Sequence, residues 1–284
     1  MNQNHQGNKD YWNLSAESWK SRREHEWKSI RDDLSLGFPR NSLEILKNFL
    51  PILKDKKACV LASGDNFAVF ALAFFGMDVT SVDISQKQLD VAEERANILG
   101  LEITFVQGDV TDCPSLKSNH FDLTFSSNGV FVWLDSPLSF FKEIERILKP
   151  GGIYMSFDIH PFQRPWEKPT TDGVLRMEKP YYESGPYKSY FNNLTGKFYD
   201  NIEEIAEKSN VSTVVEYNRT ISEIITPLLD VGLQLKHISE ERDETEEFWG
   251  EVNDNQFTKD LLDWKKNPRV GLPAWLTIVV QKTD

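Results

Sequence analysis

Residues Lys57–Ser85, KACVLASGDNFAVFALAFFGMDVTSVDIS, decide the fold of this chain. They begin with a short apolar run, Ala58–Ala62, of the kind that forms a strand covered on both faces of a parallel sheet. The turn-forming residues SGDN follow, and Phe67–Phe75 then carries no charge, which is typical of a buried helix. A second apolar run, Val79–Val82, ends at Asp83. The stretch therefore predicts strand, turn, helix and strand, as in an α/β domain.

This arrangement suits a cofactor that contains a nucleoside. A helix N-terminus at the end of a central strand, with a carboxylate such as Asp83 on the next strand, can hold the ribose hydroxyls. The dinucleotide fingerprint G-x-G-x-x-G needs a second glycine beside the pyrophosphate, whereas this turn has only Gly64, followed by Asn66 and Phe67. The negative Asp65 suits a ligand with an ammonium group. The turn therefore favours S-adenosylmethionine over NAD.

Further motifs follow in the order and spacing of one known family. They are Val60–Gly64, Gln107–Val110, Phe121–Phe125 and Ile147–Gly152. With these motifs, residues 57–157 resemble the core of a class I S-adenosylmethionine-dependent methyltransferase of the small-molecule "type 11" kind. The resemblance implies a Rossmann-like α/β fold: a seven-stranded, mostly parallel sheet with helices on both faces and one antiparallel strand, here with an inserted cap.

The first motif departs from the family pattern. The family usually has an acidic residue and two or three glycines there, and this chain has Ala62, Gly64, Asn66 and Ala68. Asparagine tolerates a positive φ, so we expect Asn66 to hold the turn. A variant motif that binds the cofactor is one interpretation, and a degenerate site that does not bind it is the alternative.

The resemblance implies a set of cofactor-binding residues at the carboxyl ends of the strands. They are Ala62, Ser63, Gly64, Asp65, Asn66, Asp83, Ile84, Gln88, Asp109, Val110, Ser127 and Asn128. Asp109 is expected to accept the adenine amino group. Similar methyltransferases cover the cofactor with an aromatic N-terminal segment, so Tyr11, Trp12 and Trp19 are candidates for cation–π contacts with the sulfonium. The alternative is that these aromatic rings only pack against the core.

The stretch 158–217 is rich in aromatic residues and proline, and we interpret it as an inserted substrate cap. The candidate substrate-binding residues are Trp133, Arg164, Tyr187 and Tyr217. His160 is the candidate catalytic residue, since an imidazole titrates near neutral pH and a base is needed when the acceptor must lose a proton. A structural role for His160 is the alternative.

The whole chain divides into four predicted regions. They are a helical lid at 1–56, the cofactor-binding core at 57–157, the substrate cap at 158–217 and the completion of the core sheet at 218–284. The polar first nine residues are expected to be disordered. Val211 to Tyr217 alternates as a strand, and Thr220 to Val231 is expected to be helical.

Composition limits the possible partners. A net charge of −12 argues against a nucleic-acid partner. No apolar run is long enough to span a membrane, and the polar start is no signal peptide, so we expect a cytoplasmic protein without a membrane partner. The two cysteines, Cys59 and Cys113, are expected to be buried and free, and no metal-ligand pattern is present. Oligomeric state is not readable from the sequence.

These observations together predict a methyltransferase that uses S-adenosylmethionine and acts on a small-molecule acceptor. Two alternatives stay open: a catalytically silent S-adenosylmethionine-binding regulator or partner protein, and an NAD-type oxidoreductase.

Overall fold

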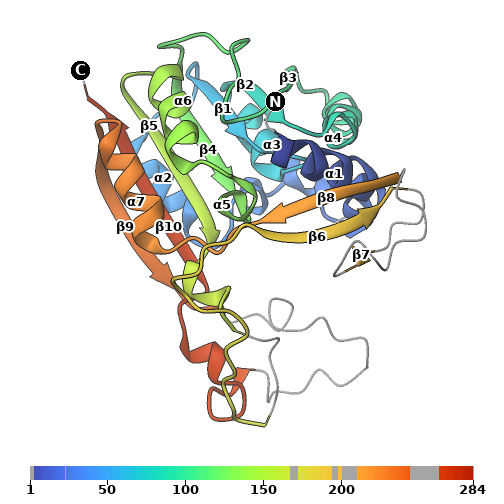
Figure 1. Cartoon of the computed structure of the whole chain (residues 1–284). Helices are drawn as coiled ribbons and strands as arrows, with labels where there is room; N and C mark the ends of the chain where they lie inside the picture. Colours follow the sequence, from blue (N-terminus) through green and yellow to red (C-terminus); the bar gives the residue numbers. More distant parts are fainter. Residues whose placement is uncertain are drawn as a thin grey trace.

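The computed structural model describes residues 3–22, 24–166, 172–193, 198–199, 210–243 and 262–283. Its centre is a seven-stranded sheet between two layers of helices (Figure 1). The strands of this sheet are β1 (Lys57–Leu61), β2 (Asp78–Asp83), β3 (Ile103–Gln107), β4 (Phe121–Ser127), β5 (Leu148–Ile159), β9 (Leu233–Glu241) and β10 (Trp275–Lys282). The α-helices are α1 (Gln3–Arg22), α2 (Ser42–Phe49), α3 (Phe67–Phe74), α4 (Gln86–Leu99), α5 (Val130–Trp133), α6 (Pro137–Ile147) and α7 (Ile221–Asp230). Short 3₁₀ turns occur at Trp27–Arg31, Leu34–Gly37, Pro161–Gln163 and Pro268–Gly271.

The strands lie in the order β3-β2-β1-β4-β5-β10-β9. The strands β1 to β5 are parallel to one another, while β10 is antiparallel to both β5 and β9. This confirms the predicted seven-stranded, mostly parallel sheet. The chain leaves β1 toward β2 on one side and returns at β4 on the other. Between β1 and β4 the order therefore reverses, and a ligand crevice is expected at the carboxyl ends of these strands.

The two faces of the sheet are covered by different helices. Ala58 and Val60 of β1 pack with α2, α3 and α4, and the alternate residues Cys59 and Leu61 pack with α6 and α7. Burial on both faces explains why the first strand reads as an uninterrupted apolar run. Cys59 and Cys113 are both buried and free, as predicted.

The helices after β1 and β2 are held at their ends by caps. The Asn66 side-chain oxygen accepts a hydrogen bond from the Ala68 N–H at 2.9 Å and so caps α3. Ser85 caps α4, and Gly100 with φ of 72° ends it. The capped α3 begins directly at the turn, so its N-terminus faces the crevice.

The backbone of this turn differs from the prediction in one detail. Asn66 has an extended backbone with φ of −60°, so it does not supply the positive φ. Ala62 and Gly64 adopt that conformation instead, with φ of 48° and 51°. Asn66 is needed for its side chain, which caps the helix, rather than for its backbone freedom.

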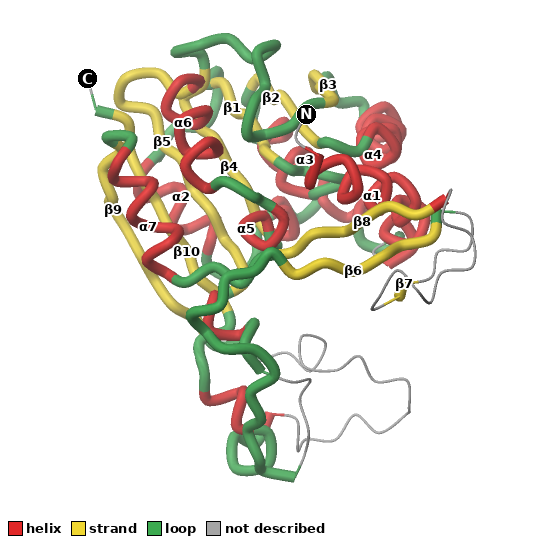
Figure 2. The backbone as a smooth tube through the Cα atoms, in the orientation of Figure 1, coloured by secondary structure: helices red, strands yellow, loops and turns green. Residues whose placement is uncertain are grey.

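The helix α1 corrects the expectation that the first nine residues are disordered, because it begins at Gln3. It lies against β8 (Val211–Glu216), as Figures 1 and 2 both show. A Cβ on Gly7 would lie 1.8 Å from the Thr213 carbonyl oxygen, so glycine is required for this close contact. Asn8 donates to the Val215 carbonyl at 3.0 Å and accepts from the Val215 N–H at 2.8 Å.

The strand β8 belongs to a second, three-stranded antiparallel sheet with the order β7-β6-β8, which includes β6 (Tyr187–Asn192) and β7 (Phe198–Tyr199). This sheet forms part of the predicted cap, and β8 confirms the strand expected at 211–217. Thr220 forms a capping box with Glu223 at the start of α7, close to the predicted helix start. Residues 167–171, 194–197, 200–209 and 244–261 lie outside the described part of the chain, and so do the parts of the cap and of the acidic segment that they contain.

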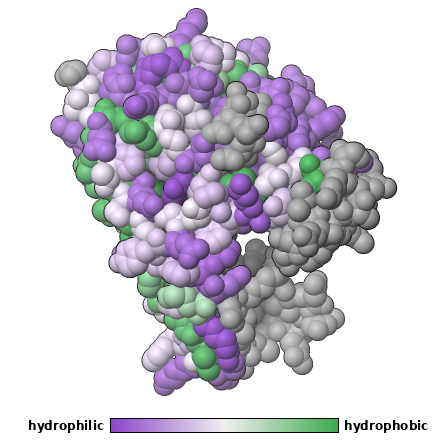
Figure 3. All heavy atoms as spheres, in the orientation of Figure 1, coloured by the Kyte–Doolittle hydropathy of each residue, from purple (hydrophilic) through white to green (hydrophobic). Residues whose placement is uncertain are grey.

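The face drawn in Figure 3 is largely hydrophilic, with apolar side chains in separate areas. This agrees with the net charge of −12. Within the ranges that the structure describes, no helix combines the length and the apolar character that crossing a membrane requires.

Candidate functional site

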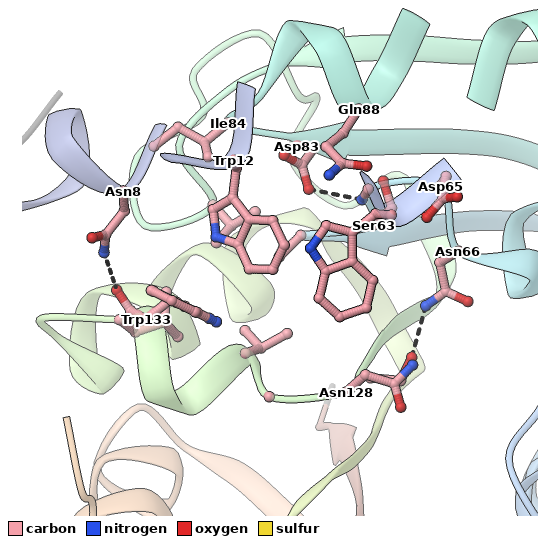
Figure 4. A pocket seen from close by; sticks show the side chains of 18 of the residues that line it. Asn8, Trp12, Ser63, Asp65, Asn66, Asp83, Ile84, Gln88, Asn128 and Trp133 are labelled. Atoms are coloured by element: carbon pink, nitrogen blue, oxygen red, sulfur yellow. Dashed lines mark hydrogen bonds between the residues drawn. The ribbon is translucent and has the colours of Figure 1, made fainter. Parts of the chain in front are cut away.

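A cavity of about 310 Å³ opens at the carboxyl ends of β1, β2, β3 and β4, beneath α1 (Figure 4). It lies where the strand order reverses, and its volume is within the range of small-molecule sites. Most of the residues that the sequence predicts for the site line it: Trp19, Ala62, Ser63, Gly64, Asp65, Asn66, Asp83, Ile84, Gln88, Asp109, Val110, Ser127, Asn128 and Trp133. The structure thus brings together residues from four strands, the glycine turn and the N-terminal helix.

The carboxylate of Asp83 is bonded directly to the glycine turn. Its Oδ2 accepts from the Gly64 N–H at 2.7 Å, and its Oδ1 accepts from the Ser85 N–H at 2.7 Å. Burial raises the pKa of Asp83 to about 6, although these two N–H groups act to lower it. A carboxylate has about four acceptor positions, so Asp83 retains capacity for hydroxyl groups of a ligand.

Asp65 lines the cavity, but its charge is already compensated. Its Oδ2 lies 2.6 Å from Nη1 of Arg95, whose side chain is 1% exposed. The same guanidinium donates to the Lys20 carbonyl at 2.8 Å, at the end of α1. Asp65 therefore connects the glycine turn to the N-terminal helix through Arg95. The sequence predicted a contact of Asp65 with a ligand ammonium group, and it did not show this structural role.

The loop after β4 forms the opposite wall. Ser127 accepts a hydrogen bond from the Asn66 side-chain amide at 2.7 Å, which ties this loop to the glycine turn. Asn128 and Gly129 both have positive φ, at 66° and 101°. Behind the loop lies the buried carboxylate of Asp158, which accepts from backbone N–H groups between Gly129 and Phe131 and so fixes the loop from below.

At the β3 end of the cavity, Asp109 is held by partners on two sides. Its Oδ1 accepts from the N–H and the hydroxyl of Thr111 at 3.0 and 2.7 Å. Its Oδ2 lies 2.6 Å from Nδ1 of His5, which comes from α1 and also lines the cavity. Burial acts to raise the pKa of Asp109, but the hydrogen bonds from His5 and Thr111 outweigh it, so the pKa is lowered.

Three tryptophans surround the remaining space. The ring centroids of Trp12 and Trp19 are 5.7 Å apart, and those of Trp12 and Trp133 are 5.2 Å apart (Figure 4). Tyr11 does not line the cavity. It stacks on Trp133 at 5.8 Å and contacts Phe191 and Phe198 on the other side. The helix α1 thus presents Trp12 and Trp19 to the cavity, whereas the Tyr11 ring packs against other aromatic rings outside the cavity lining.

His160 lies outside the residues that line the cavity. Its Nδ1 accepts from the Phe162 N–H at 3.1 Å, and its Nε2 lies 2.8 Å from Oε1 of Glu240. Burial lowers the pKa of His160, against the opposing effect of Glu240. Nδ1 caps the 3₁₀ turn that follows and Nε2 connects the end of β5 to β9, so both ring nitrogens are occupied and the geometry favours the structural alternative over a catalytic base.

Three of the four predicted substrate-binding residues also lie outside the cavity lining. Arg164 pairs with Glu216 at 3.3 Å and donates to Asn218. The hydroxyl of Tyr187 donates to the Glu183 carbonyl, and the ring of Tyr217 lies under the Arg219 guanidinium. These side chains stabilise the connection between the cap and the core.

Several lining residues were not predicted from the sequence. They are His5, Asn8, Phe67, Gly108, Gly129, Val130 and Leu134. Gly129, Val130 and Leu134 adjoin motif residues and could have been found by extending the motifs. His5 and Asn8 carry no such signal, because their partners lie 104 and 207 positions away in the sequence.

Three features define a class I methyltransferase domain: the strand order, the antiparallel β10, and a glycine turn bonded to Asp83 where the strand order reverses. S-adenosylmethionine is the cofactor of this class. Residues 60–156 match the family described as "Methyltransferase domain". This match covers the core of the chain and not the segments on either side of it.

Individual proteins resemble the chain over the same core. A methyltransferase of Bacillus subtilis, YbaJ, is 34% identical over 119 residues, which cover 42% of this chain and 46% of that protein. A fatty-acid O-methyltransferase of Mycolicibacterium smegmatis is 33% identical over 118 residues, covering 40% of this chain and 41% of that protein. The chain thus spans less than half of the length of these two relatives.

Solved structures share the fold over most of the chain. The S-adenosylmethionine-dependent methyltransferase of Mesorhizobium loti superposes with a TM-score of 0.58 at 19% sequence identity, over 87% of this chain and 100% of that chain. At this identity the likeness concerns the fold alone.

Proposed function

We propose that this protein is an S-adenosylmethionine-dependent methyltransferase that acts on a small, largely apolar acceptor. The observation that carries the proposal is the hydrogen bond between Asp83 and the Gly64 N–H, because it places a buried carboxylate and the start of α3 at one end of a cavity of about 310 Å³. The variant glycine motif keeps this geometry, since its positive φ angles lie at Ala62 and Gly64.

The residues around the cavity fit the chemistry of the cofactor. Asp83 has acceptor positions left for the ribose hydroxyls, and Ile84 and Val110 offer apolar surface for the adenine ring beside Asp109. The faces of Trp12 and Trp19 suit a positively charged sulfonium. When bound, S-adenosylmethionine supplies a methyl group that an acceptor atom takes by in-line displacement, as the carbon–sulfur bond breaks and S-adenosylhomocysteine leaves.

The chain's own contribution to the reaction is positioning and exclusion of water. Among the described residues, the ionisable side chains that line the cavity are His5, Asp65, Asp83 and Asp109, and each is hydrogen bonded within the protein. We infer that the site aligns an acceptor atom that is nucleophilic without a protein base at this cavity.

The tryptophans indicate the kind of acceptor. Trp12, Trp19 and Trp133 enclose the space next to the loop after β4, where the acceptor must lie to reach the methyl group. Their rings favour an acceptor with an apolar or aromatic body. The fatty-acid O-methyltransferase relative is consistent with an acceptor that has a long apolar part.

The test is methyl transfer from labelled S-adenosylmethionine to acceptors of different chemistry. The panel should contain a fatty acid, a quinol, an aromatic amine and a phosphorylated sugar, and label in the product and released S-adenosylhomocysteine should both be measured. We expect turnover with an apolar acceptor and none with the phosphorylated sugar. Binding of S-adenosylhomocysteine without transfer to any acceptor, including a whole metabolite extract, would favour the silent binding protein instead.

A further inference from the structure

His5, in the first part of α1, lines the cavity. The helix contributes four lining residues, His5, Asn8, Trp12 and Trp19, from one face along most of its length. The His5 residue is 3% exposed, although it lies near the start of the chain in a polar segment. Such burial of an imidazole next to the predicted adenine-binding carboxylate calls for an explanation beyond packing.

The imidazole lies between two carboxylates. Its Nδ1 is 2.6 Å from Oδ2 of Asp109, and its Nε2 is 3.1 Å from Oδ1 of Asp135. If the ring were neutral with its proton on Nδ1, Nε2 could only accept a hydrogen bond, and the Asp135 N–H lies 3.4 Å from it. The protonated ring has an N–H on each nitrogen and therefore matches both shorter contacts, since an imidazolium donates at both positions.

The charged groups that face His5 from the neighbouring elements support this protonation state. They are Asp109 after β3 and Asp135 after α5, while the nearby Arg219 directs its guanidinium to the carbonyl oxygens of Leu134 and Asp135. Burial acts to lower the pKa of His5, but the hydrogen bond to Asp109 and the charges of the two carboxylates outweigh it and raise the pKa above its ordinary value.

We propose that His5 completes the adenine end of the cofactor site and holds α1 closed over it through ion pairs with Asp109 and Asp135, so that the cofactor is bound most tightly when His5 is protonated. This inference rests on the proposed function, because it concerns the same cavity.

The geometry is compatible with His5 and a cofactor sharing Asp109. Thr111 occupies two acceptor positions on Oδ1, and His5 occupies one on Oδ2. Of the roughly four acceptor positions of a carboxylate, one on Oδ2 is left for an adenine amino group. The positive imidazolium also offsets the repulsion between the two carboxylates, neither of which lies on α1, so its two ion pairs attach α1 to the core.

The direction of the pH effect follows from the raised pKa of His5. The ion pairs are complete while the ring is protonated, and they are lost as the pH rises through the pKa that His5 has in the closed protein. The affinity for S-adenosylhomocysteine should therefore fall with rising pH. A helix held only by packing and by the hydrogen bonds of Asn8 would show no such dependence.

The experiment measures S-adenosylhomocysteine binding by calorimetry from about pH 7 to about pH 9, so that Asp83, whose pKa is about 6, stays mostly ionised while His5 titrates. His5→Gln should lose about tenfold in affinity at the low end, the size expected for a charge-assisted hydrogen bond, and its affinity should be flat with pH. Asp135→Asn should keep a pH dependence but shift it to lower pH, because one of the two carboxylates is neutral. His25→Gln is the matched control, since His25 is exposed and lies outside the lining.

Two results would overturn the proposal: wild-type affinity and pH dependence in His5→Gln, or tighter binding in His5→Gln, which would mean that His5 competes with the cofactor. A nuclear magnetic resonance titration of the His5 ring in the ligand-free protein separates this inference from the proposed function. A ring pKa above the ordinary value for histidine is expected, and a value at or below it would overturn the inference. Failure of the wild type to bind S-adenosylhomocysteine would overturn the proposed function and this inference with it.

Discussion

Replacing Arg95 by methionine should loosen both the glycine turn and the N-terminal helix. Its guanidinium is 1% exposed and bonds Asp65 at 2.6 Å and the Lys20 carbonyl at 2.8 Å, and it lies over the Trp27 ring at 5.6 Å. Because Asp65 is 21% exposed, its carboxylate can be partly rehydrated after the change. We therefore expect a loss of about 2–3 kcal/mol, below the full cost of stranding a buried charge.

The assay is urea denaturation of Arg95→Met, Asp65→Asn and the double variant. The coupling energy of the pair should be about 1–2 kcal/mol. Lys20→Met is the matched control, because Lys20 pairs with Glu94 at the surface and should cost less than about 0.5 kcal/mol. Arg95→Met should also weaken the binding of S-adenosylhomocysteine. If Arg95→Met lowers the free energy of unfolding no more than Lys20→Met does, Arg95 does not connect the glycine turn to α1.

Three further changes test other parts of the site. The pKa of Asp158 is raised to about 7 by burial, so the folded protein retains a proton that the unfolded chain releases near about pH 4, and stability should fall as the pH rises between these values. Thermal melts of Asp158→Asn should show a shallower slope, because the raised pKa of Asp83 contributes the remainder, and an unchanged slope would contradict the assignment. Asn66→Ala removes the α3 cap and the bond to Ser127 and should cost about 1 kcal/mol in urea denaturation, whereas no loss would argue against the cap. Gly7→Ala should displace α1, since its Cβ would lie 1.8 Å from the Thr213 carbonyl oxygen, and hydrogen exchange in α1 should then be faster than in the wild type if the close contact holds the helix.

The sheet and most of the cavity could be predicted because their signals are local. The apolar run of β1, the caps of α4 at Ser85 and Gly100, and the carboxylate at the end of β2 each depend on neighbours in the sequence. The carboxyl ends of parallel strands meet at one edge of the sheet, and the polar residues of this chain follow those ends. Predicting the strands of the core therefore also predicts the position of the site.

The N-terminal helix could not be predicted from residue 3 onward, because what holds it is distant in the sequence. Its first turns are polar and lack an apolar stripe, and they are ordered by contacts of His5 with Asp109 and of Asn8 with Val215. The same limit applies to two predicted substrate-binding residues that lie outside the cavity lining. Arg164 and Tyr187 have the chemistry of a binding site, but the path of the chain after β5 turns them toward their own neighbours.

The central claim is that Asp83 and the glycine turn together hold the adenosyl part of the cofactor. Calorimetry with S-adenosylhomocysteine on the wild type, Asp83→Ala and Asp78→Ala tests it most directly, since Asp78 is an exposed carboxylate at the other end of β2. The account predicts binding by the wild type and Asp78→Ala, and a loss of about tenfold or more in Asp83→Ala, as for a charge-assisted hydrogen bond. Equal affinity of Asp83→Ala and the wild type, or no binding by the wild type, would contradict it.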